Sequence, residues 1–445
     1  HCESSAASDV YKRQYVYKSN DGGKSWKNIT TGIPDGFLCW RLVQDHVDKN
    51  LMFLGTEYGV YVSVNGGKKW VKFSSGLPTI SVRDLAIQKR ENDLIAATFG
   101  RGFYVLDDYS SLRFLSATSL KNNLVFSPRK ALQYNPIRSG STSQGSNTYY
   151  AKNPDYGAIL TFYMSDEILT KKQMRLKVEK GLEKSNSNIP FPGWKELDDE
   201  LNEKNPITII EIYNSEKSFI DRFTLPYKKG FNRVSWDLTR KIKTHVTSGS
   251  SRFYSPSIRV KPGKYSFNVY TAYGGQVNKI GSKFFEVERI RPGVLDNPNN
   301  DKIEEYVVEI ENTFNEYSFV NSKFNKIKET NNSIISLISR SSNYQSYVEP
   351  YNNIQNIIND IDVFVSGNKS KKDVREKDIE TISDRLSVAV RGLNSSYGPT
   401  KMHIESLGKA ISLINQYADM VEMLSKDFNK LKNQLESSTD LLILD

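Results

Sequence analysis

The chain has 445 residues, of which 38% are hydrophobic and 11% aromatic, enough for roughly two to four domains with apolar cores. No apolar run approaches the roughly 18 residues of a membrane helix, so no membrane span is expected. The formal net charge of +10 is spread along the whole chain. Because basic and aromatic residues are not interleaved, we expect a solvating surface and exclude nucleic acid as the expected partner.

Residues 1–14 read HCESSAASDVYKRQ and differ in character from the rest. They resemble the in-frame translation of a transposon-based sequencing adapter, so we expect native sequence to begin near Tyr15. On this interpretation the chain is the C-terminal part of a longer protein. The lack of a visible signal peptide then says nothing about export.

Neither a disulfide framework nor a metal site is expected. Cys2 lies in residues 1–14, which leaves Cys39 as a single native thiol. The native histidines have no ligand spacing to one another; they are His46, His245 and His403. No phosphate loop, serine elbow or zinc-protease helix motif is present, so no cofactor is expected.

Two related motifs organise residues 15–119. SNDGGKSW begins at Ser19, and SVNGGKKW begins at Ser63, 44 residues later. The phrase TEYGVYV from Thr56 recurs as TFGRGFYV from Thr98. Short apolar strands broken by turn clusters at this period predict the blades of a β-propeller.

The motif chemistry predicts a tight turn. Asp21 can accept hydrogen bonds from nearby backbone N–H groups, and the glycines permit positive φ. Trp26 is then expected to bury its ring between sheets. The second copy carries Asn65 in place of the Asp and Lys69 in place of the Ser or Thr. The residues expected to play this structural role are Ser19, Asp21, Gly23, Trp26, Ser63, Asn65, Gly67 and Trp70.

This motif resembles the Asp-box (BNR repeat) of sialidase-like and sortilin-like propellers. The resemblance implies that each box joins the third and fourth strands of a blade and that the opposite face holds the ligand. The candidates on that face are Trp40, Glu57, Tyr58, Phe99 and Arg101. Either Glu57 and Arg101 face a sugar or peptide at the mouth of the funnel, or Arg101 forms a ring-closing ion pair and Tyr58 serves packing.

Residues 120–290 carry evenly spaced alternating strands between turn signals, which predicts an immunoglobulin-like β-sandwich. The phrases GFNRVSWDL and KPGKYSFNVY resemble the Ig-like module of flagellar hook-capping proteins, which implies that Trp236 and Tyr265 anchor the core. An insertion at 166–204 is charged and helical on either side of the phrase IPFPGW. It is either a lid or docking arm, or a clip that covers an edge strand.

Residues 298–445 change to helical periodicity and predict a bundle. Helices are expected from Asn300 to about Arg340, from Pro350, over 374–393 and over 400–436. The last carries an apolar stripe that begins at Ile404. The stripe is either a coiled-coil seam for a partner or an intramolecular packing face.

The predicted fold is therefore multidomain: partial β-propeller blades and an Ig-like β-sandwich, followed by an all-α helical bundle. This order of parts resembles a group of large bacterial proteins with sortilin-type or sialidase-like propellers, often called glycosyl-hydrolase-like. The resemblance implies a secreted, periplasmic or cell-surface protein.

Two functions remain open. The first is a non-catalytic part of an exported propeller protein, structural or binding a glycan or protein. The alternative is a sialidase-like or glucanase-like glycoside hydrolase whose catalytic residues lie in blades outside this chain. This chain presents no catalytic set, because one arginine stands where sialidases use a triad. Sortilin's disulfide-rich segment is absent, so receptor function is not carried over.

Overall fold

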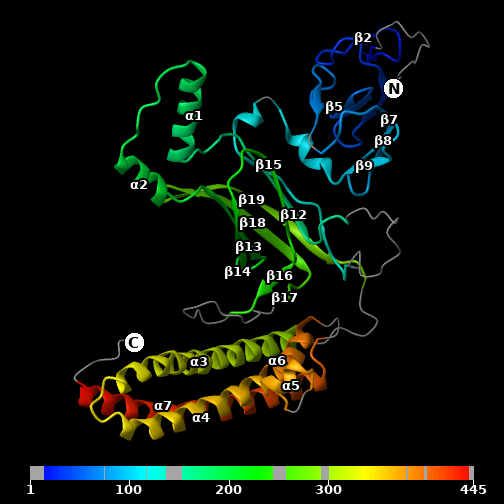
Figure 1. Ribbon diagram of the computed structural model, residues 1–445. Helices are drawn as coiled ribbons and strands as arrows, with labels where there is room; N and C mark the ends of the chain where they lie inside the picture. The colour runs from blue at the N-terminus through cyan, green and yellow to red at the C-terminus, as the bar shows by residue number, and fades with distance from the viewer. Residues whose placement is uncertain are drawn as a thin grey trace. The chain divides into compact units, whose positions relative to one another are not determined.

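A computed structural model gives the fold and describes residues 15–74, 76–116, 118–136, 153–243, 257–291, 300–376, 379–394 and 398–439. The predicted adapter segment, 1–14, lies outside these residues. β-Sheets occupy the earlier part of the chain and helices the C-terminal part (Figure 1). No helix in the described ranges is long and apolar enough to cross a membrane.

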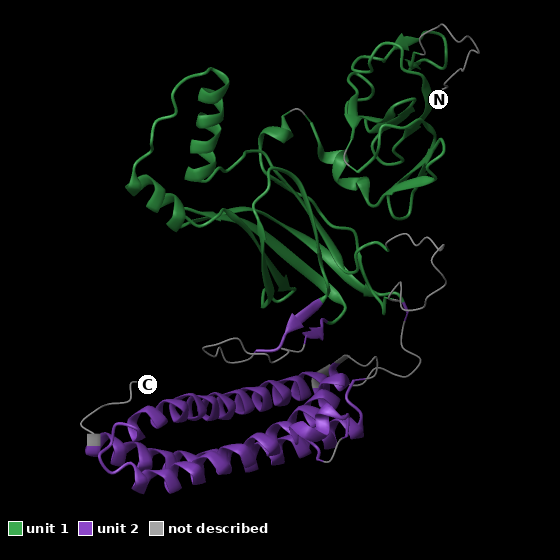
Figure 2. Ribbon diagram, viewed as in Figure 1, with its two compact units in different colours: residues 1–238, 261–290 green, residues 239–260, 291–445 purple. Residues whose placement is uncertain are grey.

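The chain divides into two compact units (Figure 2). Unit 1 comprises residues 1–238 and 261–290, and unit 2 comprises residues 239–260 and 291–445. The residues predicted as propeller blades and as sandwich therefore share one unit. Within it, Arg233 donates to the backbone oxygens of Asp107 and Asp108, at 2.6 Å each.

Unit 1 begins with three antiparallel sheets in which each strand pairs with the next along the chain. The first pairs β1 (Tyr17–Lys18) with β2 (Lys27–Asn28). The second contains β3 (Cys39–Gln44), β4 (Met52–Thr56), β5 (Gly59–Ser63) and β6 (Val71–Phe73). The third contains β7 (Val82–Gln88), β8 (Asp93–Thr98) and β9 (Phe103–Leu106). The short 3-10 helices η1 (Tyr109–Phe114) and η2 (Ser119–Lys121) follow.

Two apolar clusters hold these sheets together. One contains Phe53 of β4 and Leu85 of β7, so it joins the second sheet to the third. The other contains Ile29, just after β2, and Tyr61 of β5, so it joins the first sheet to the second. A Cβ added to Gly55 would lie 2.7 Å from the carbonyl oxygen of Val82, so the close approach of β4 to β7 requires glycine.

The second and third sheets share an irregularity in their first strands. The register of β3 against β4 shifts between Cys39 and Arg41, and that of β7 against β8 shifts between Val82 and Asp84. Trp40 and the residue after Val82, Arg83, therefore occupy the bulges. A bulge re-aims the side chain that it carries, and bulges are common beside functional sites.

The rest of unit 1 contains two further sheets. The three-stranded sheet has the order β10 (Leu124–Val125), β12 (Ala158–Met164), β15 (Gly230–Trp236). The five-stranded sheet has the order β11 (Ala131–Gln133), β19 (Gln276–Arg289), β18 (Gly263–Tyr273), β13 (Ile207–Asn214), β14 (Phe219–Pro226). Only the β11–β19 pairing is parallel among the pairings of these two sheets.

An aromatic core joins these two sheets. Trp236 at the end of β15 is buried, and its ring centroid lies 5.8 Å from that of Tyr265 on β18 and 6.1 Å from that of Phe285 on β19. All three side chains are buried. The sheets therefore pack face to face, as aromatic side chains on their inner surfaces favour.

Two helices interrupt the strands within the predicted insertion 166–204. They are α1 (Lys171–Lys184) and α2 (Trp194–Asn202). Thr170 and Gln173 form a capping box at the start of α1. Neither helix has a buried residue, which argues against a clip that covers an edge strand by burying apolar side chains.

One segment of the predicted sandwich range belongs to unit 2. Residues 239–260, within the predicted range 120–290, contain β16 (Thr239–Lys241) and β17 (Ser257–Arg259). Ile242 follows β16 and Ile258 lies in β17, and both side chains are buried in the same apolar core as the helices. The predicted boundary is wrong here because the hairpin packs with the helices.

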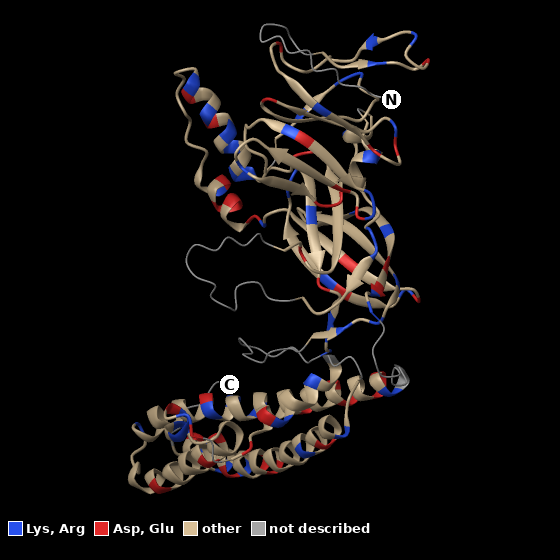
Figure 3. Ribbon diagram, turned by 90° about the vertical axis from the view of Figure 1, so that its right-hand side faces the viewer, with Lys and Arg blue, Asp and Glu red and all other residues tan. Residues whose placement is uncertain are grey.

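The helices of unit 2 are α3 (Asn300–Ile338), α4 (Gln345–Ser366), α5 (Lys369–Asp373), α6 (Ile382–Arg391), η3 (Gly392–Asn394) and α7 (Lys401–Thr439). Both acidic and basic positions occur along them (Figure 3). Most of the apolar stripe of α7 is buried in the core of this unit, although Ile404 is exposed. The stripe therefore serves intramolecular packing.

Two helix starts differ from those predicted. Pro350 lies inside α4, which begins at Gln345, and Tyr347 packs against the helical core ahead of the proline. The third predicted helix, 374–393, begins only at Ile382. There the side chain of Thr381 accepts from the backbone N–H of Asp384 in a capping box, which fixes the start.

Candidate ligand-binding site

Three of the residues predicted for the ligand face, Trp40, Glu57 and Phe99, lie around Arg83, which was not predicted as a site residue. The indole N–H of Trp40 donates to Oε2 of Glu57 at 2.9 Å. The guanidinium carbon of Arg83 lies 3.7 Å from the ring centroid of Trp40 and 5.2 Å from that of Phe99. We call Trp40, Glu57, Arg83 and Phe99 the arginine stack.

Equivalent positions of two consecutive sheets build the arginine stack. Trp40 and Arg83 occupy the bulges of β3 and β7. Glu57 follows β4 and donates its backbone N–H to Leu38 at 2.9 Å, and Phe99 follows β8 and donates its backbone N–H to Ser81 at 2.9 Å. The same backbone arrangement in both sheets therefore presents all four side chains.

The arginine stack combines exposed ring surface with a fixed acceptor. Phe99 is 69% exposed. Oε2 of Glu57 accepts from Trp40 and, at 3.4 Å, from the hydroxyl of Ser81, and it lies 4.0 Å from a guanidinium nitrogen of Arg83. These contacts hold the carboxylate in place. A guanidinium between two rings is favourably placed for cation–π attraction, and the outer ring faces can contact a ligand.

The other two predicted residues lie apart from this stack. Tyr58 is half-exposed and packs on Phe37, with ring centroids 4.6 Å apart. Arg101 is exposed and makes no ion pair with any residue that the structure describes; its ring-closing role stays a prediction. The missed residue, Arg83, could have been found by aligning Val82–Asp84 with Cys39–Arg41.

The two box motifs form turns with matching hydrogen bonds. In the first, Ser19 Oγ accepts from the backbone N–H of Gly23 at 2.7 Å, and Asp21 Oδ1 accepts from that of Ser25 at 2.9 Å. In the second, the corresponding bonds run from Gly67 to Ser63 at 2.9 Å and from Lys69 to Asn65 at 3.0 Å. The second turn lies between β5 and β6, the third and fourth strands of its sheet.

The first turn contains an ionisable group that the second lacks. Hydrogen bonds from the hydroxyl and backbone N–H of Ser25, with a further one from Ser19, lower the pKa of Asp21 to about 2. The Ser25 hydroxyl lies 2.6 Å from Oδ2 of Asp21. Asn65 accepts in the same place but does not titrate.

The predicted burial of Trp26 is wrong. Trp26 is 48% exposed, and its indole N–H donates to Gly23 within its own turn. Trp70 is 2% exposed, and its indole N–H donates to the carbonyl of Ile29 at 2.6 Å. The difference arises because the segment around Ile29 covers Trp70, whereas no described segment covers Trp26 in this way.

A second polar cluster in unit 1 is structural. Asp45 is buried and accepts from the Tyr109 hydroxyl at 2.6 Å and from Nε of Arg113 at 2.8 Å. Burial alone would raise the pKa of Asp45, but the hydrogen bonds from Arg113 and Tyr109 outweigh it and lower this pKa. Because each oxygen of Asp45 already has donors, this network ties η1 to the β3–β4 turn and has no group left for a ligand.

The thiol of Cys39 is shielded from solvent. Cys39 begins β3 and is buried, and its burial raises the pKa of the thiol to about 11. A thiol with such a pKa is neutral and a poor nucleophile at pH 7. In the described ranges, no three His, Cys, Asp or Glu side chains gather where they could hold a metal ion.

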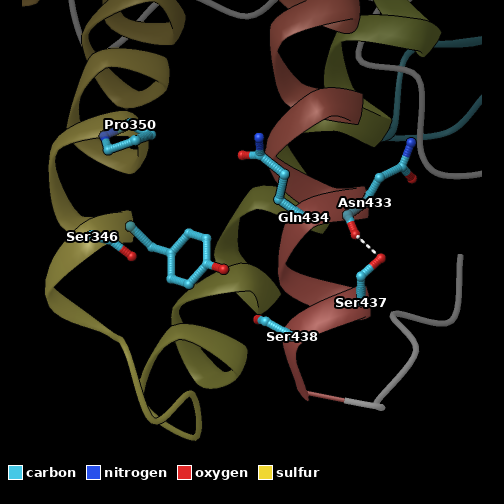
Figure 4. A pocket seen from close by; sticks show the side chains of 7 residues that line it. Ser346, Pro350, Asn433, Gln434, Ser437 and Ser438 are labelled. Carbon is cyan, nitrogen blue, oxygen red and sulfur yellow. Dashed lines mark hydrogen bonds between the residues drawn. The ribbon is translucent and has the colours of Figure 1, made fainter.

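An open cavity of about 650 Å³ lies between α4 and α7 of unit 2 (Figure 4). Ser346, Tyr347 and Pro350 line it from α4, and Asn433 and nearby polar residues line it from α7. The lining contains no Asp, Glu, Lys, Arg or His. The cavity therefore offers mainly neutral hydrogen-bonding groups, from serine, asparagine, glutamine and tyrosine side chains.

Comparisons with known proteins give no family. No family model matches the chain, and no curated protein matches it. One similar solved structure is the extracellular domain of the proposed one-component system BT4673 from B. thetaiotaomicron, at 13% identity and a TM-score of 0.18, covering 63% of this chain and 29% of that chain. Another is dimeric latent PorU from Porphyromonas gingivalis, at 13% identity and a TM-score of 0.16, covering 57% and 29% of the two chains. Likeness at these TM-scores carries no argument about fold or function.

Proposed function

We propose that the chain is a non-catalytic binding part of an exported Asp-box propeller protein and that the arginine stack holds a glycan or a segment of another protein. The observation that carries this proposal is the arginine stack itself: an exposed Phe99, a guanidinium sandwiched at 3.7 Å from Trp40, and a carboxylate held by Trp40. Rings with fixed polar groups beside them are typical of ligand sites.

Three features support propeller blades as the scaffold. Consecutive strands form separate antiparallel sheets, a box turn joins the third and fourth strands of the four-stranded sheet, and the arginine stack draws equivalent residues from two sheets. Repeated sheets with a common turn are the expectation for propellers. The buried pair Trp236 and Tyr265, whose hydroxyl donates to the backbone oxygen of Lys261 at 2.7 Å, supports an Ig-like module after them. Export, to a secreted, periplasmic or surface location, rests on the resemblance to bacterial propeller proteins.

Binding is favoured over glycoside hydrolysis by the carboxylate count of the arginine stack. Glycosidases place two carboxyl groups roughly 5–10 Å apart across the scissile bond. The arginine stack supplies Glu57 alone, and Oε2 of Glu57 already accepts from Trp40. Release of sugar from sialosides or β-glucans by the protein would contradict a non-catalytic role.

Binding can be tested with a glycan array and a peptide library, followed by calorimetry on any ligand found. Truncation of Trp40 or Phe99 to Ala should weaken binding about tenfold or more, as loss of a ring contact worth about 1.4 kcal/mol would do. The matched control is Phe219→Ala, because Phe219 is also an exposed phenylalanine under an arginine, with Arg222 5.4 Å from its ring. Equal loss in the control and the Phe99 variant would contradict this site.

A further inference from the structure

The α1–α2 insertion presents an amphipathic helix with its apolar side outward. At about 100° per residue, Trp194, Leu197 and Leu201 of α2 share one face. Trp194 is 77% exposed and Leu201 is 84% exposed. In a globular domain such a stripe ordinarily faces the core. Here it faces solvent, and Phe191 extends it, with its ring centroid 5.1 Å from that of Trp194.

The opposite face of α2 is bound to α1. Glu200 receives a bidentate pair of hydrogen bonds from Arg175, at 2.7 and 2.8 Å, and Asp199 lies 3.4 Å from the ammonium of Lys171. A carboxylate of Glu203 accepts from the hydroxyl of Tyr273 on β18, which ties the end of α2 to the five-stranded sheet. These contacts fix the polar face inward and leave the apolar face unpartnered within the described part of the chain.

The first helix carries a complementary strip. Met174, Val178 and Leu182 lie on one face of α1, where Met174 and Val178 are exposed. Lys177 and Lys184 lie along one side of this face, at about 100° per residue. Over its length α1 has six basic and two acidic residues, whereas α2 has four acidic residues and one lysine. Figure 3 shows the difference in charge between the two helices.

We propose that the α1–α2 insertion joins two copies of this chain, with α1 of each copy packed on α2 of the other. In each of the two contacts, the apolar strip of α1 packs on the apolar strip of α2, and the basic residues beside the first lie near the acidic residues beside the second. A two-fold axis relates the two contacts. Such self-complementary pairing is the commonest form of homodimer. The four carboxylates of α2 oppose binding of Trp194 to an anionic lipid surface, and exposed aromatic anchors are typical of protein interfaces. This inference does not depend on the proposed function.

Sedimentation of the whole chain over a concentration series tests the proposal. We expect a monomer–dimer equilibrium in which Trp194→Ala raises the dissociation constant roughly tenfold or more. Phe284→Ala is the matched control, since Phe284 is 79% exposed on β19, outside the insertion. Both side chains are exposed in the single chain, so thermal unfolding measured at concentrations where the chain is monomeric should stay unchanged in both variants. A chain that remains monomeric at a protein concentration of about 100 μM overturns the proposal, because its dissociation constant would then be well above this concentration and the association very weak.

A charge exchange separates this interface from nonspecific association. Lys177→Glu or Asp198→Lys alone should weaken the dimer, because like charges then face each other twice. A mixture of the two variants should form a heterodimer, because each interface regains an opposite pair. A dimer whose dissociation constant is unchanged by these substitutions overturns the proposal. A chain that is monomeric and sediments with vesicles containing anionic lipid also overturns it.

Discussion

The two box turns, Ser19–Trp26 and Ser63–Trp70, have the same local structure in different surroundings. In both, a serine hydroxyl accepts from the second glycine, and an Asp or Asn oxygen accepts four residues ahead. Yet Trp70 is almost wholly buried and Trp26 is half exposed. The turn is therefore encoded locally, whereas the anchoring of its tryptophan depends on whether another segment covers it.

The largest expected difference between the turns is the cost of losing each tryptophan. Trp70→Ala should lower the free energy of unfolding of unit 1 by about 3–5 kcal/mol, since it leaves a cavity beside Ile29. Trp26→Ala should cost only about 1 kcal/mol, because much of its surface is already in water. Urea unfolding of both variants measures the contrast. Equal losses would mean that Trp26 is covered in solution.

A smaller contrast is expected at the second glycines. Gly67 has φ of 86°, and a Cβ added there would lie 2.6 Å from Cδ1 of Ile29. Gly23 has φ of 93°, and its nearest contact would be the Trp26 ring at 3.9 Å. Both Ala variants strain the backbone by about 1 kcal/mol, but Gly67→Ala should cost about 2–4 kcal/mol in total through overpacking. Denaturant midpoints would measure the two losses, and similar values would contradict the contact with Ile29.

The smallest expected contrast is in pH dependence. The carboxylate of Asp21 stabilises its turn fully above its unfolded pKa of about 3.9, and this contribution is lost as the pH falls through about 2. Asn65 has no such dependence. An NMR titration should show the Ser25 amide moving with a midpoint near 2 and the Lys69 amide unchanged. Asp21→Asn should abolish the first response, and a midpoint near 4 would show that the Ser25 bonds do not persist in solution.

The sequence predicted what depends on residues close together in the chain. The box turns close within eight residues, the strands around Trp236 follow from alternation, and the C-terminal helices follow from helical spacing. The burial of Trp26 could not be predicted in the same way, because it depends on a covering segment distant in sequence. The predicted sandwich boundary failed for the same reason, since residues 239–260 follow their contacts with the helices.

The candidate site was predicted in part. Trp40, Glu57 and Phe99 lie together as the loop pattern indicated, but the arginine beside Phe99 is Arg83 and not Arg101. Alternation along a regular strand does not predict which way the Arg83 side chain points. The bulge inserts an extra residue into β7 and so changes the direction of that side chain. The outward face of α2 was also missed, since a helical stripe predicts burial by default.

The buried thiol of Cys39 can report on the stability of this region. Cys39 is next to Trp40 in the chain, at the start of β3. A shielded, neutral thiol is alkylated only when its strand opens, so the labelling rate measures the frequency of that opening. A ligand held by Trp40 should slow the reaction by the factor by which it favours the closed strand. Labelling followed at Cys39 itself, since the chain also contains Cys2, thus measures local unfolding and provides a binding assay that needs no knowledge of the ligand's chemistry.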